Sequence, residues 1–274
     1  MGHEASGIVL DIGEGVKKVK KDDYVVVSWI KGEGIEAEPP KYKSKKGLVS
    51  AGPAATFLEY AVISENRVVP IDKKVKASIA ALLGCAVPTG MGIVKGLNMK
   101  EGQKIVVFGI GGIGACALLK AKSLGAQATA VDIVDWKLKW AKEELGADEV
   151  IKPGQLSSKD FDFAIECSGN KKAMETAFEC VKDSGTVVIA GNLEPGEKIS
   201  IDPFSLIKGK KIYGTWGGET ILDLDIPGYV KEYLNGNLKL DKLITAEYRF
   251  DDINQGLRDL ENGKLIRGVV KISD

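Results

Sequence analysis

The stretch Ile105-Val106-Val107-Phe108-Gly109-Ile110-Gly111-Gly112-Ile113-Gly114 decides the fold of this chain. An apolar run typical of a β-strand ends in a glycine-rich turn, and a helical pattern follows at once. The glycines at 109, 111 and 114 form the G-x-G-x-x-G pattern of dinucleotide-binding turns. The first allows a tight turn, the second leaves room for a pyrophosphate, and the third lets the helix pack closely. We expect the whole turn, including Gly112 and Ile113, to contact the cofactor, because the helix N-terminus attracts phosphates.

The residues after this turn predict which dinucleotide binds. A second expected strand, at 127–132, ends in Asp132, about 20 residues beyond the turn, where a carboxylate accepts the ribose hydroxyls. A carboxylate there would repel the 2′-phosphate of NADP, and Ile133 and Val134 supply no arginine to bind one. The sequence therefore predicts NAD. Lys137 lies either near the adenosine ribose or on the solvated face of a lysine-rich helix.

Strands and helices are expected to alternate from residue 104 to residue 216. Six strands joined by helical crossovers predict an α/β fold with a doubly wound parallel sheet. The segment from Lys210 to Thr215 would be the last strand and therefore an open edge. The expected strands are 104–108, 127–132, 148–152, 161–166, 185–190 and 210–215, and the expected helices are 112–124, 135–145 and 171–182.

The two ends of the chain follow a different pattern. Residues 1–75 carry short β-type runs separated by Gly, Pro and charged turns, which predicts a small, irregular, antiparallel, barrel-like unit. These runs are 7–10, 24–30, 59–63 and 67–70. Beyond residue 217 we expect a helix at 227–235 with Pro227 in its first turn, a strand at 245–250, a helix at 251–262 capped by Asp251, and a strand at 268–272.

Composition excludes several classes of partner. The 274 residues include 38 Lys and Arg and 38 Asp and Glu, so the net charge is zero and no basic field would attract nucleic acid. The four cysteines show no C-x-x-C spacing, which indicates reduced thiols in a cytoplasmic protein. No apolar run is long enough to span a bilayer, and the sequence does not begin like a signal peptide, so no membrane partner is expected.

Four motifs in this order resemble those of the medium-chain zinc-dependent alcohol dehydrogenases. Gly2-His3-Glu4-Ala5-Ser6-Gly7 is similar to the family's GHE motif. Gly84-Cys85-Ala86-Val87-Pro88-Thr89-Gly90 is similar to its second metal-ligand turn. The glycine turn with Asp132 follows, and the tail at 263–270 resembles the C-terminal signature. The resemblance covers essentially the whole chain.

The resemblance implies a fold, two cofactors and a set of site residues. It implies an N-terminally truncated GroES-like catalytic domain at 1–85, a Rossmann NAD-binding domain at 86–216, and a return to the catalytic domain at 217–274. Zinc accepts imidazole, thiolate and carboxylate ligands and acts as a Lewis acid on an alcohol or carbonyl oxygen. The implied roles are zinc ligands for His3 and Cys85, a neighbouring or alternate ligand for Glu4, a nicotinamide contact for Thr89, and a pyrophosphate contact for Arg267.

The sequence also departs from the family pattern. It begins at the GHE motif, so we expect the segment that supplies the first cysteine ligand and the start of the proton relay to be missing, and zinc to bind weakly. The stretch that carries four closely spaced cysteines in many relatives, here 28–52, contains none. We therefore expect no structural zinc.

The predicted function is NAD-dependent oxidation of a small alcohol or polyol, or reduction of the aldehyde, by a zinc-type dehydrogenase. The alternative is an NAD-binding remnant with an incomplete zinc site and little or no dehydrogenase activity. A zinc-independent quinone or enone reductase is disfavoured, since His3 and Cys85 occupy ligand positions. Relatives pair the edge strand at Lys210 to Thr215 across a two-fold axis, so we expect a homodimer or tetramer. Trp29 and Trp216 either face the cleft or serve ordinary packing.

Overall fold

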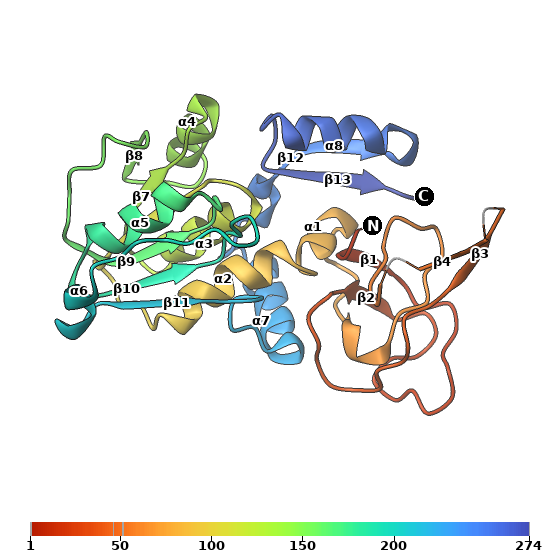
Figure 1. Ribbon diagram of the computed structural model, residues 1–274. Helices are drawn as coiled ribbons and strands as arrows, with labels where there is room; N and C mark the ends of the chain where they lie inside the picture. The colour runs from red at the N-terminus through yellow and green to blue at the C-terminus, as the bar shows by residue number, and fades with distance from the viewer. Residues whose placement is uncertain (1, 46, 51, 274) are drawn as a thin grey trace. The chain divides into compact units, whose positions relative to one another are not determined.

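The computed structural model describes residues 2–45, 47–50 and 52–273 and divides the chain into two compact units (Figure 1). The first, here called the N-terminal unit, comprises Met1–Pro88, Thr220–Glu261 and Gly268–Asp274. The second, here called the sheet unit, comprises Thr89–Glu219 and Asn262–Arg267. Within the described part of the chain, no helix combines the length and the apolar character needed to cross a membrane.

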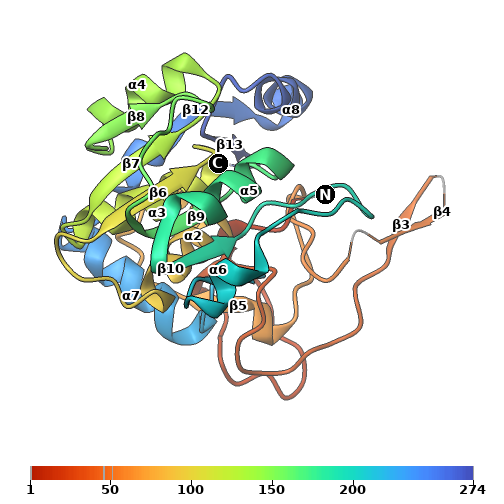
Figure 2. The same ribbon diagram turned by 60° about the vertical axis from the view of Figure 1, so that its left-hand side comes forward.

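The sheet unit is built on six parallel strands in the order β11-β10-β9-β6-β7-β8 (β11 is labelled in Figure 1 and the other five in Figure 2). Counted from the first strand of the sheet, this is the order of a doubly wound, dinucleotide-binding sheet with two mononucleotide halves. The predicted α/β class and parallel sheet are therefore confirmed. The strands are β6 (Lys104–Phe108), β7 (Gln127–Val131), β8 (Glu149–Ile151), β9 (Phe161–Glu166), β10 (Val181–Ile189) and β11 (Lys211–Gly214).

Helices cover this sheet because each crossover buries one apolar stripe. α3 (Gly112–Ser123) packs against β6 and β7, while α5 (Lys171–Cys180) packs against β9 and β10. The remaining helices of the unit are α2 (Ala86–Gly96), which begins just before it, α4 (Asp135–Glu143) and α6 (Pro203–Ile207). The core between strands and α5 is made of close-packed apolar residues, namely Val106, Phe108, Val131, Phe161, Ala164, Ala177, Phe178, Cys180, Val181 and Val187.

The end of α5 differs from the prediction of a helix reaching residue 182. α5 ends at Cys180, and β10 begins at Val181, four residues earlier than expected. The cause is a distant lysine. The buried Nζ of Lys210 donates to Phe178 O at 2.9 Å and to Glu179 O at 3.3 Å. These hydrogen bonds satisfy carbonyls that have no intrahelical partner, so the helix can stop there.

The N-terminal unit contains a three-stranded antiparallel sheet in the order β1-β2-β5. Its strands are β1 (Ala5–Ile8), β2 (Tyr24–Val27) and β5 (Val68–Pro70), and one buried cluster beside them consists of Val19, Val25, Val27 and Val68. The first part of the unit also contains η1 (Glu65–Arg67), α1 (Ala77–Leu82) and the hairpin of β3 (Tyr42–Ser44) and β4 (Gly47–Val49), which projects from the sheet (Figure 1).

The strand expected at 59–63 is absent from the structure, which shows no regular element there. The N–H of Val62 donates to Tyr42 Oη at 3.0 Å instead of to another strand. A side-chain partner has replaced the ladder that the β-type run predicted.

The chain from Leu222 onwards supplies the remaining elements: α7 (Leu222–Leu234), η2 (Leu240–Leu243), β12 (Ile244–Arg249), η3 (Phe250–Asp252), α8 (Ile253–Glu261) and β13 (Arg267–Lys271), with β12 and β13 paired. Pro227 lies inside α7 and not in its first turn, so that prediction was wrong. The helix begins earlier because Asp225 accepts the N–H of Ile221 at 2.8 Å and places a carboxylate in the first turn. Asp251 lies within η3 and is not the N-cap that was expected.

Candidate active site

The glycine turn joins β6 to α3, and its shape depends on the missing side chains. Gly109 has a φ of +84°, which only glycine adopts without strain. A Cβ at Gly114 would lie 2.0 Å from the carbonyl oxygen of Gly109, so no larger residue fits. A Cβ at Gly111 would meet nothing within 4 Å. The turn is thus tight on its inner side and leaves room beside the N-terminus of α3, as a bound pyrophosphate requires.

Asp132 follows β7 and holds the same turn from the neighbouring strand. Its Oδ2 accepts the N–H of Ile110 at 2.7 Å, and its Oδ1 accepts the N–H of Val134 at 2.9 Å. The residue is buried, so the carboxylate is fixed in one orientation. An ionised carboxylate offers about four acceptor positions, which leaves capacity for ribose hydroxyls.

Arg267 lies beside the start of α3. A Cβ at Gly112 would lie 2.8 Å from Arg267 Cδ and 2.9 Å from its Nη1. Burial lowers the pKa of Arg267 to about 10, so the guanidinium is still charged at neutral pH. The guanidinium and the positive end of the α3 dipole lie on the same side of the turn, and each of them favours a negative charge. This arrangement therefore suits an anion that contacts both the guanidinium and the helix N-terminus.

Lys137 and Thr89 are the other predicted cofactor residues in the sheet unit. The Nζ of Lys137 lies 5.9 Å from the ring centre of Trp136, whose indole N–H donates to Gly263 O at 3.0 Å. Thr89 lies in α2 and is buried, and its Oγ1 has no hydrogen-bond partner among the described residues. A buried hydroxyl of this kind is costly unless something bonds to it, which fits a ligand contact.

A buried glutamate that was not among the predicted site residues supports the other side of the turn. Glu166 ends β9, is fully buried, and accepts the N–H of Ser168 at 2.7 Å. Burial raises the pKa of this carboxyl group above its ordinary value. A Cβ at Gly109 would lie 2.7 Å from the nitrogen of Ser168, so the residues held by Glu166 pack directly on the turn. An acid at the end of a central strand was the sequence signal that could have identified it.

His3 and Cys85, the two predicted zinc ligands from distant parts of the sequence, lie together in the N-terminal unit. Nε2 of His3 is 3.2 Å from Sγ of Cys85. Two ligands of one tetrahedral zinc, at usual bond lengths, have nitrogen and sulfur about 3.5 Å apart. Gly84 makes this approach possible, because a Cβ there would lie 2.3 Å from Val27 O and 2.7 Å from Glu4 Cβ. The pair therefore fits two positions of a zinc site.

Glu4, the predicted neighbouring ligand, accepts a hydrogen bond from the backbone of Ala86. Its Oε2 accepts the N–H of Ala86 at 3.2 Å, at the start of α2, where a carboxylate also favours the helix dipole. Within residues 2–45, 47–50 and 52–273, no cluster of three or more His, Cys, Asp or Glu side chains could hold a metal ion. The described residues thus bring His3 and Cys85 together and keep Glu4 beside them without a third donor in place.

Trp29 also contacts the cysteine. Its indole Nε1 donates to Cys85 Sγ at 3.1 Å, and the side chain is half-buried. From the sequence, Trp29 could either face the cleft or serve ordinary packing. The hydrogen bond to Cys85 could not be predicted, because the two residues are 56 positions apart in the chain.

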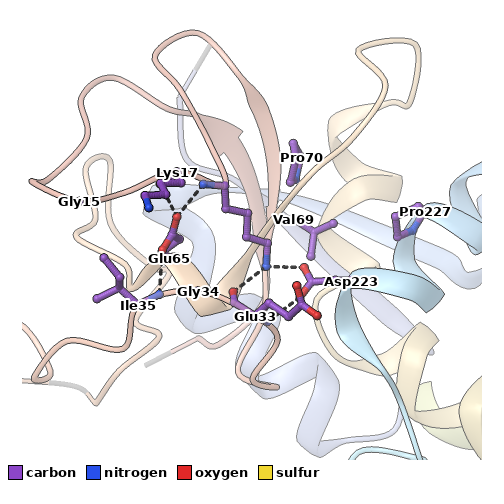
Figure 3. A pocket seen from close by; sticks show the side chains of 11 residues that line it. Gly15, Lys17, Glu33, Gly34, Ile35, Glu65, Val69, Pro70, Asp223 and Pro227 are labelled. Carbon is purple, nitrogen blue, oxygen red and sulfur yellow. Dashed lines mark hydrogen bonds and ion pairs between the residues drawn. The ribbon is translucent and has the colours of Figure 1, made fainter.

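A separate hollow of about 780 Å³ lies elsewhere in the N-terminal unit (Figure 3). Lys18 pairs with Asp223 across it, and Glu65 accepts the N–H groups of Lys17 and Lys18 at 2.6 Å each and of Ile35 at 2.8 Å. No predicted site residue lines it. The charged groups of the hollow bind one another, so we interpret it as a framework that fixes loops and not as the active site.

Comparison with known proteins agrees with the fold and these motifs. Residues 1–73 match the family described as alcohol dehydrogenase GroES-like domain, and residues 112–234 match that described as zinc-binding dehydrogenase. The S-(hydroxymethyl)glutathione dehydrogenase of Saccharomyces cerevisiae is 32% identical, over 99% of this chain and 81% of the relative. The benzyl alcohol dehydrogenase of Acinetobacter calcoaceticus superposes with a TM-score of 0.87 at 28% identity, over 100% of this chain and 84% of that one. The 2R,3R-butanediol dehydrogenase from Bacillus subtilis superposes with a TM-score of 0.79 at 26% identity, over 99% of this chain and 80% of that one.

The fold and the glycine turn define a dinucleotide-binding protein of the doubly wound class. The chain belongs to the medium-chain zinc-dependent alcohol dehydrogenase family. It is an enzyme of that family, an NAD-dependent oxidoreductase of the zinc alcohol dehydrogenase type.

Proposed function

We propose that the sheet unit holds NAD with its pyrophosphate at the N-terminus of α3. The observation that carries this proposal is the charged guanidinium of Arg267 beside Gly112, at a helix end that is already positive. In this arrangement Gly111 leaves space for the pyrophosphate, and the fixed carboxylate of Asp132 accepts the ribose hydroxyls. Ile113 follows as the next residue of the turn. Thr89, with its unsatisfied hydroxyl, contacts the nicotinamide, and Lys137 lies near the adenosine ribose.

His3 and Cys85 are the proposed zinc ligands, with Glu4 as a neighbour that can replace its bond to Ala86. When bound, zinc supplies a Lewis acid that favours the alkoxide form of an alcohol, and NAD accepts the hydride. The protein's own contribution is to hold imidazole and thiolate within contact distance before the metal arrives, so less ordering is needed on binding. The comparisons give no specific support to the alternative of a remnant without dehydrogenase activity. We propose no structural zinc in the cysteine-free stretch at 28–52.

The proposed substrate is a small alcohol or polyol, or the corresponding aldehyde. The relatives are a dehydrogenase of S-(hydroxymethyl)glutathione, one of benzyl alcohol and one of 2R,3R-butanediol. These names span a thiol adduct, an aromatic alcohol and a diol, so we propose the hydroxyl group as the shared feature and not one of the three compounds. A panel of these three alcohols with NAD as oxidant is the first assay to run.

The cofactor site can be tested by titrating NADH fluorescence with Arg267→Leu and a matched control. Loss of a charge-assisted hydrogen bond costs about 1.5–3 kcal/mol, so NADH affinity should fall by about 10- to 100-fold. Arg249→Leu removes an exposed arginine of the N-terminal unit and should leave the affinity unchanged. Wild type should bind NADH more tightly than NADPH. Equal affinities for Arg267→Leu and wild type would reject the pyrophosphate role.

The edge strand of the sheet and the cysteines bear on the assembly and the location of the protein. β11 is the terminal strand of the six-stranded sheet, so the edge from Lys210 to Thr215 has unpaired backbone groups that a second copy could pair. We propose a homodimer or tetramer, which light scattering tests directly. Cys85, Cys116, Cys167 and Cys180 form no disulfide among the described residues, which suits the reducing cytoplasm. We keep 1–85, 86–216 and 217–274 as the proposed functional domains.

A further inference from the structure

The loop that follows β2 is tied at its start to the residue before Cys85. Ser28 is fully buried, and its hydroxyl donates to Gly84 O at 2.6 Å. The hydroxyl oxygen of Ser28 in turn accepts the N–H of Ile30 at 3.0 Å. The backbone on both sides of Trp29 is therefore fixed relative to Gly84, the immediate neighbour of Cys85.

Two buried charged residues from η1 hold this loop further along. Arg67 is 5% exposed and donates to Trp29 O, and its Nη2 lies 2.9 Å from Glu36 Oε1. Glu65 accepts the N–H of Ile35 at 2.8 Å (Figure 3). Buried charged groups are stable only where they are well bonded, and two of these bonds go to the backbone of the Trp29 loop, at Trp29 O and at the N–H of Ile35. The loop that carries Trp29 is thus rigidly anchored in a stretch that has no cysteines.

The indole Nε1 of Trp29, on this anchored loop, donates a hydrogen bond to the sulfur of Cys85 at 3.1 Å. The same sulfur lies 3.2 Å from His3 Nε2. Indole N–H is a donor only, so the sulfur is the acceptor of this hydrogen bond. A sulfur that accepts an N–H bond from a fixed donor has one lone-pair direction occupied, and the others turn towards the remaining neighbours.

We propose that Trp29 is a positioning residue for the metal-ligating thiolate. Its N–H fixes Cys85 Sγ towards His3 and withdraws part of the negative charge from the sulfur. The inference rests on the proposed role of Cys85 as a zinc ligand. Hydrogen bonds of this outer kind orient metal ligands, and their removal typically weakens metal binding by about 10- to 100-fold.

The decisive variant is Trp29→Phe, which keeps an aromatic ring and removes the N–H. The matched control is Trp136→Phe, which removes an indole hydrogen bond to Gly263 O in the sheet unit. Zinc affinity of the full chain is measured by competition with a chromophoric chelator. Trp29→Phe should bind zinc about 10-fold more weakly, and Trp136→Phe should bind like wild type.

A second readout separates the hydrogen bond from packing. In the Co²⁺-loaded protein, thiolate-to-metal charge-transfer absorption reports the energy of the sulfur lone pairs. An N–H bond stabilises those lone pairs, so its loss in Trp29→Phe should move the band to longer wavelength. Loss of packing alone would change the affinity without this shift.

Cys85→Ser distinguishes failure of the inference from failure of the proposed site. If Cys85→Ser binds zinc like wild type, Cys85 is not a ligand and both proposals fall. If Cys85→Ser loses zinc while Trp29→Phe keeps wild-type affinity and an unshifted band, the zinc site stands and the role of Trp29 is rejected. The inference is supported if Trp29→Phe binds zinc more weakly and shows the shifted band, while Trp136→Phe shows neither change.

Discussion

The two units of the molecule build their candidate sites by opposite means. In the sheet unit the proposed cofactor site is formed mainly by backbone: a strand, a tight turn and the end of a helix. The shape of this site depends on glycine, which has no side chain, at Gly109, Gly111 and Gly114. In the N-terminal unit the site is side chains, with His3, Trp29 and Cys85 meeting on loops and strand ends. The glycine turn can be recognised in one short stretch of sequence. The cluster of His3, Trp29 and Cys85 forms only when distant segments of the chain come together.

The two units also differ in what keeps them folded. The sheet unit buries a continuous apolar core between β9, β10 and α5. The N-terminal unit also buries apolar side chains, but in addition it holds buried carboxylate and guanidinium groups that are bonded to backbone. We therefore expect the sheet unit to respond mainly to steric changes and the N-terminal unit to respond to changes of charge and pH.

The largest effect is expected from Gly114→Ala in the sheet unit. The added methyl group would lie 2.0 Å from Gly109 O, and neither backbone can move without distorting β6 or α3. Overpacking of this kind costs about 3 kcal/mol, so the urea midpoint should fall clearly and NADH binding should be lost with the turn.

Gly111→Ala is its matched control, because a Cβ there meets nothing within 4 Å and the backbone is extended. Its urea midpoint should equal that of wild type, yet NADH should bind about 10-fold more weakly, since the methyl group occupies the space left for the pyrophosphate. Wild-type NADH affinity in Gly111→Ala would show that the cofactor lies elsewhere.

An intermediate effect is expected from Lys210→Met. This change removes the donor from the buried carbonyl of Phe178 and from the part-buried carbonyl of Glu179, which costs about 1–3 kcal/mol. Lys198→Met alters an exposed lysine of the same unit and should change stability by less than about 0.5 kcal/mol. Equal unfolding free energies for the two variants in urea would contradict the capping role.

The smallest effect is expected from Glu65→Gln, and it concerns pH. Hydrogen bonds from the backbone of Ile35, Lys18 and Lys17 lower the pKa of Glu65 in the folded protein. A carboxyl group with a lowered folded pKa adds stability above its unfolded pKa of about 4.3, and this stability is lost as the pH falls below that value. The urea midpoint of wild type should thus decrease more steeply between about pH 5 and pH 3 than that of Glu65→Gln.

Glu59→Gln, which removes an exposed carboxylate from the same unit, is the control and should keep the wild-type slope. Parallel slopes for wild type and Glu65→Gln would mean that the unit does not depend on this carboxylate.

The sequence predicted the sheet unit well because its signals are local. The strands at 104–108 and 161–166 match the structure at both ends, since an apolar run and its flanking turns lie within a few residues. The errors have distant causes. The end of α5 depends on Lys210, and the lost strand at 59–63 depends on Tyr42. The contact of Trp29 with Cys85 likewise has no local signature.

Pro227 illustrates a different limit. Proline is common in the first helical turn, so its position predicted a helix start. The acidic residues Asp223 and Asp225 favoured an earlier start, and their influence outweighed the hydrogen bond that proline removes. Tendencies of single residues therefore compete, and only the folded chain shows which one prevails.

The ion pair of Lys18 with Asp223 and the bond from Glu33 N to Asp223 have a consequence for biosynthesis. During translation the sheet unit, which begins at Thr89, is almost complete before Asp223 leaves the ribosome. Domains generally fold as they emerge, so the residues before Thr89 leave the ribosome ahead of Asp223 and can pair with it only after most of the sheet unit has been made. The N-terminal unit therefore completes these contacts late, although much of it leaves the ribosome before the sheet unit.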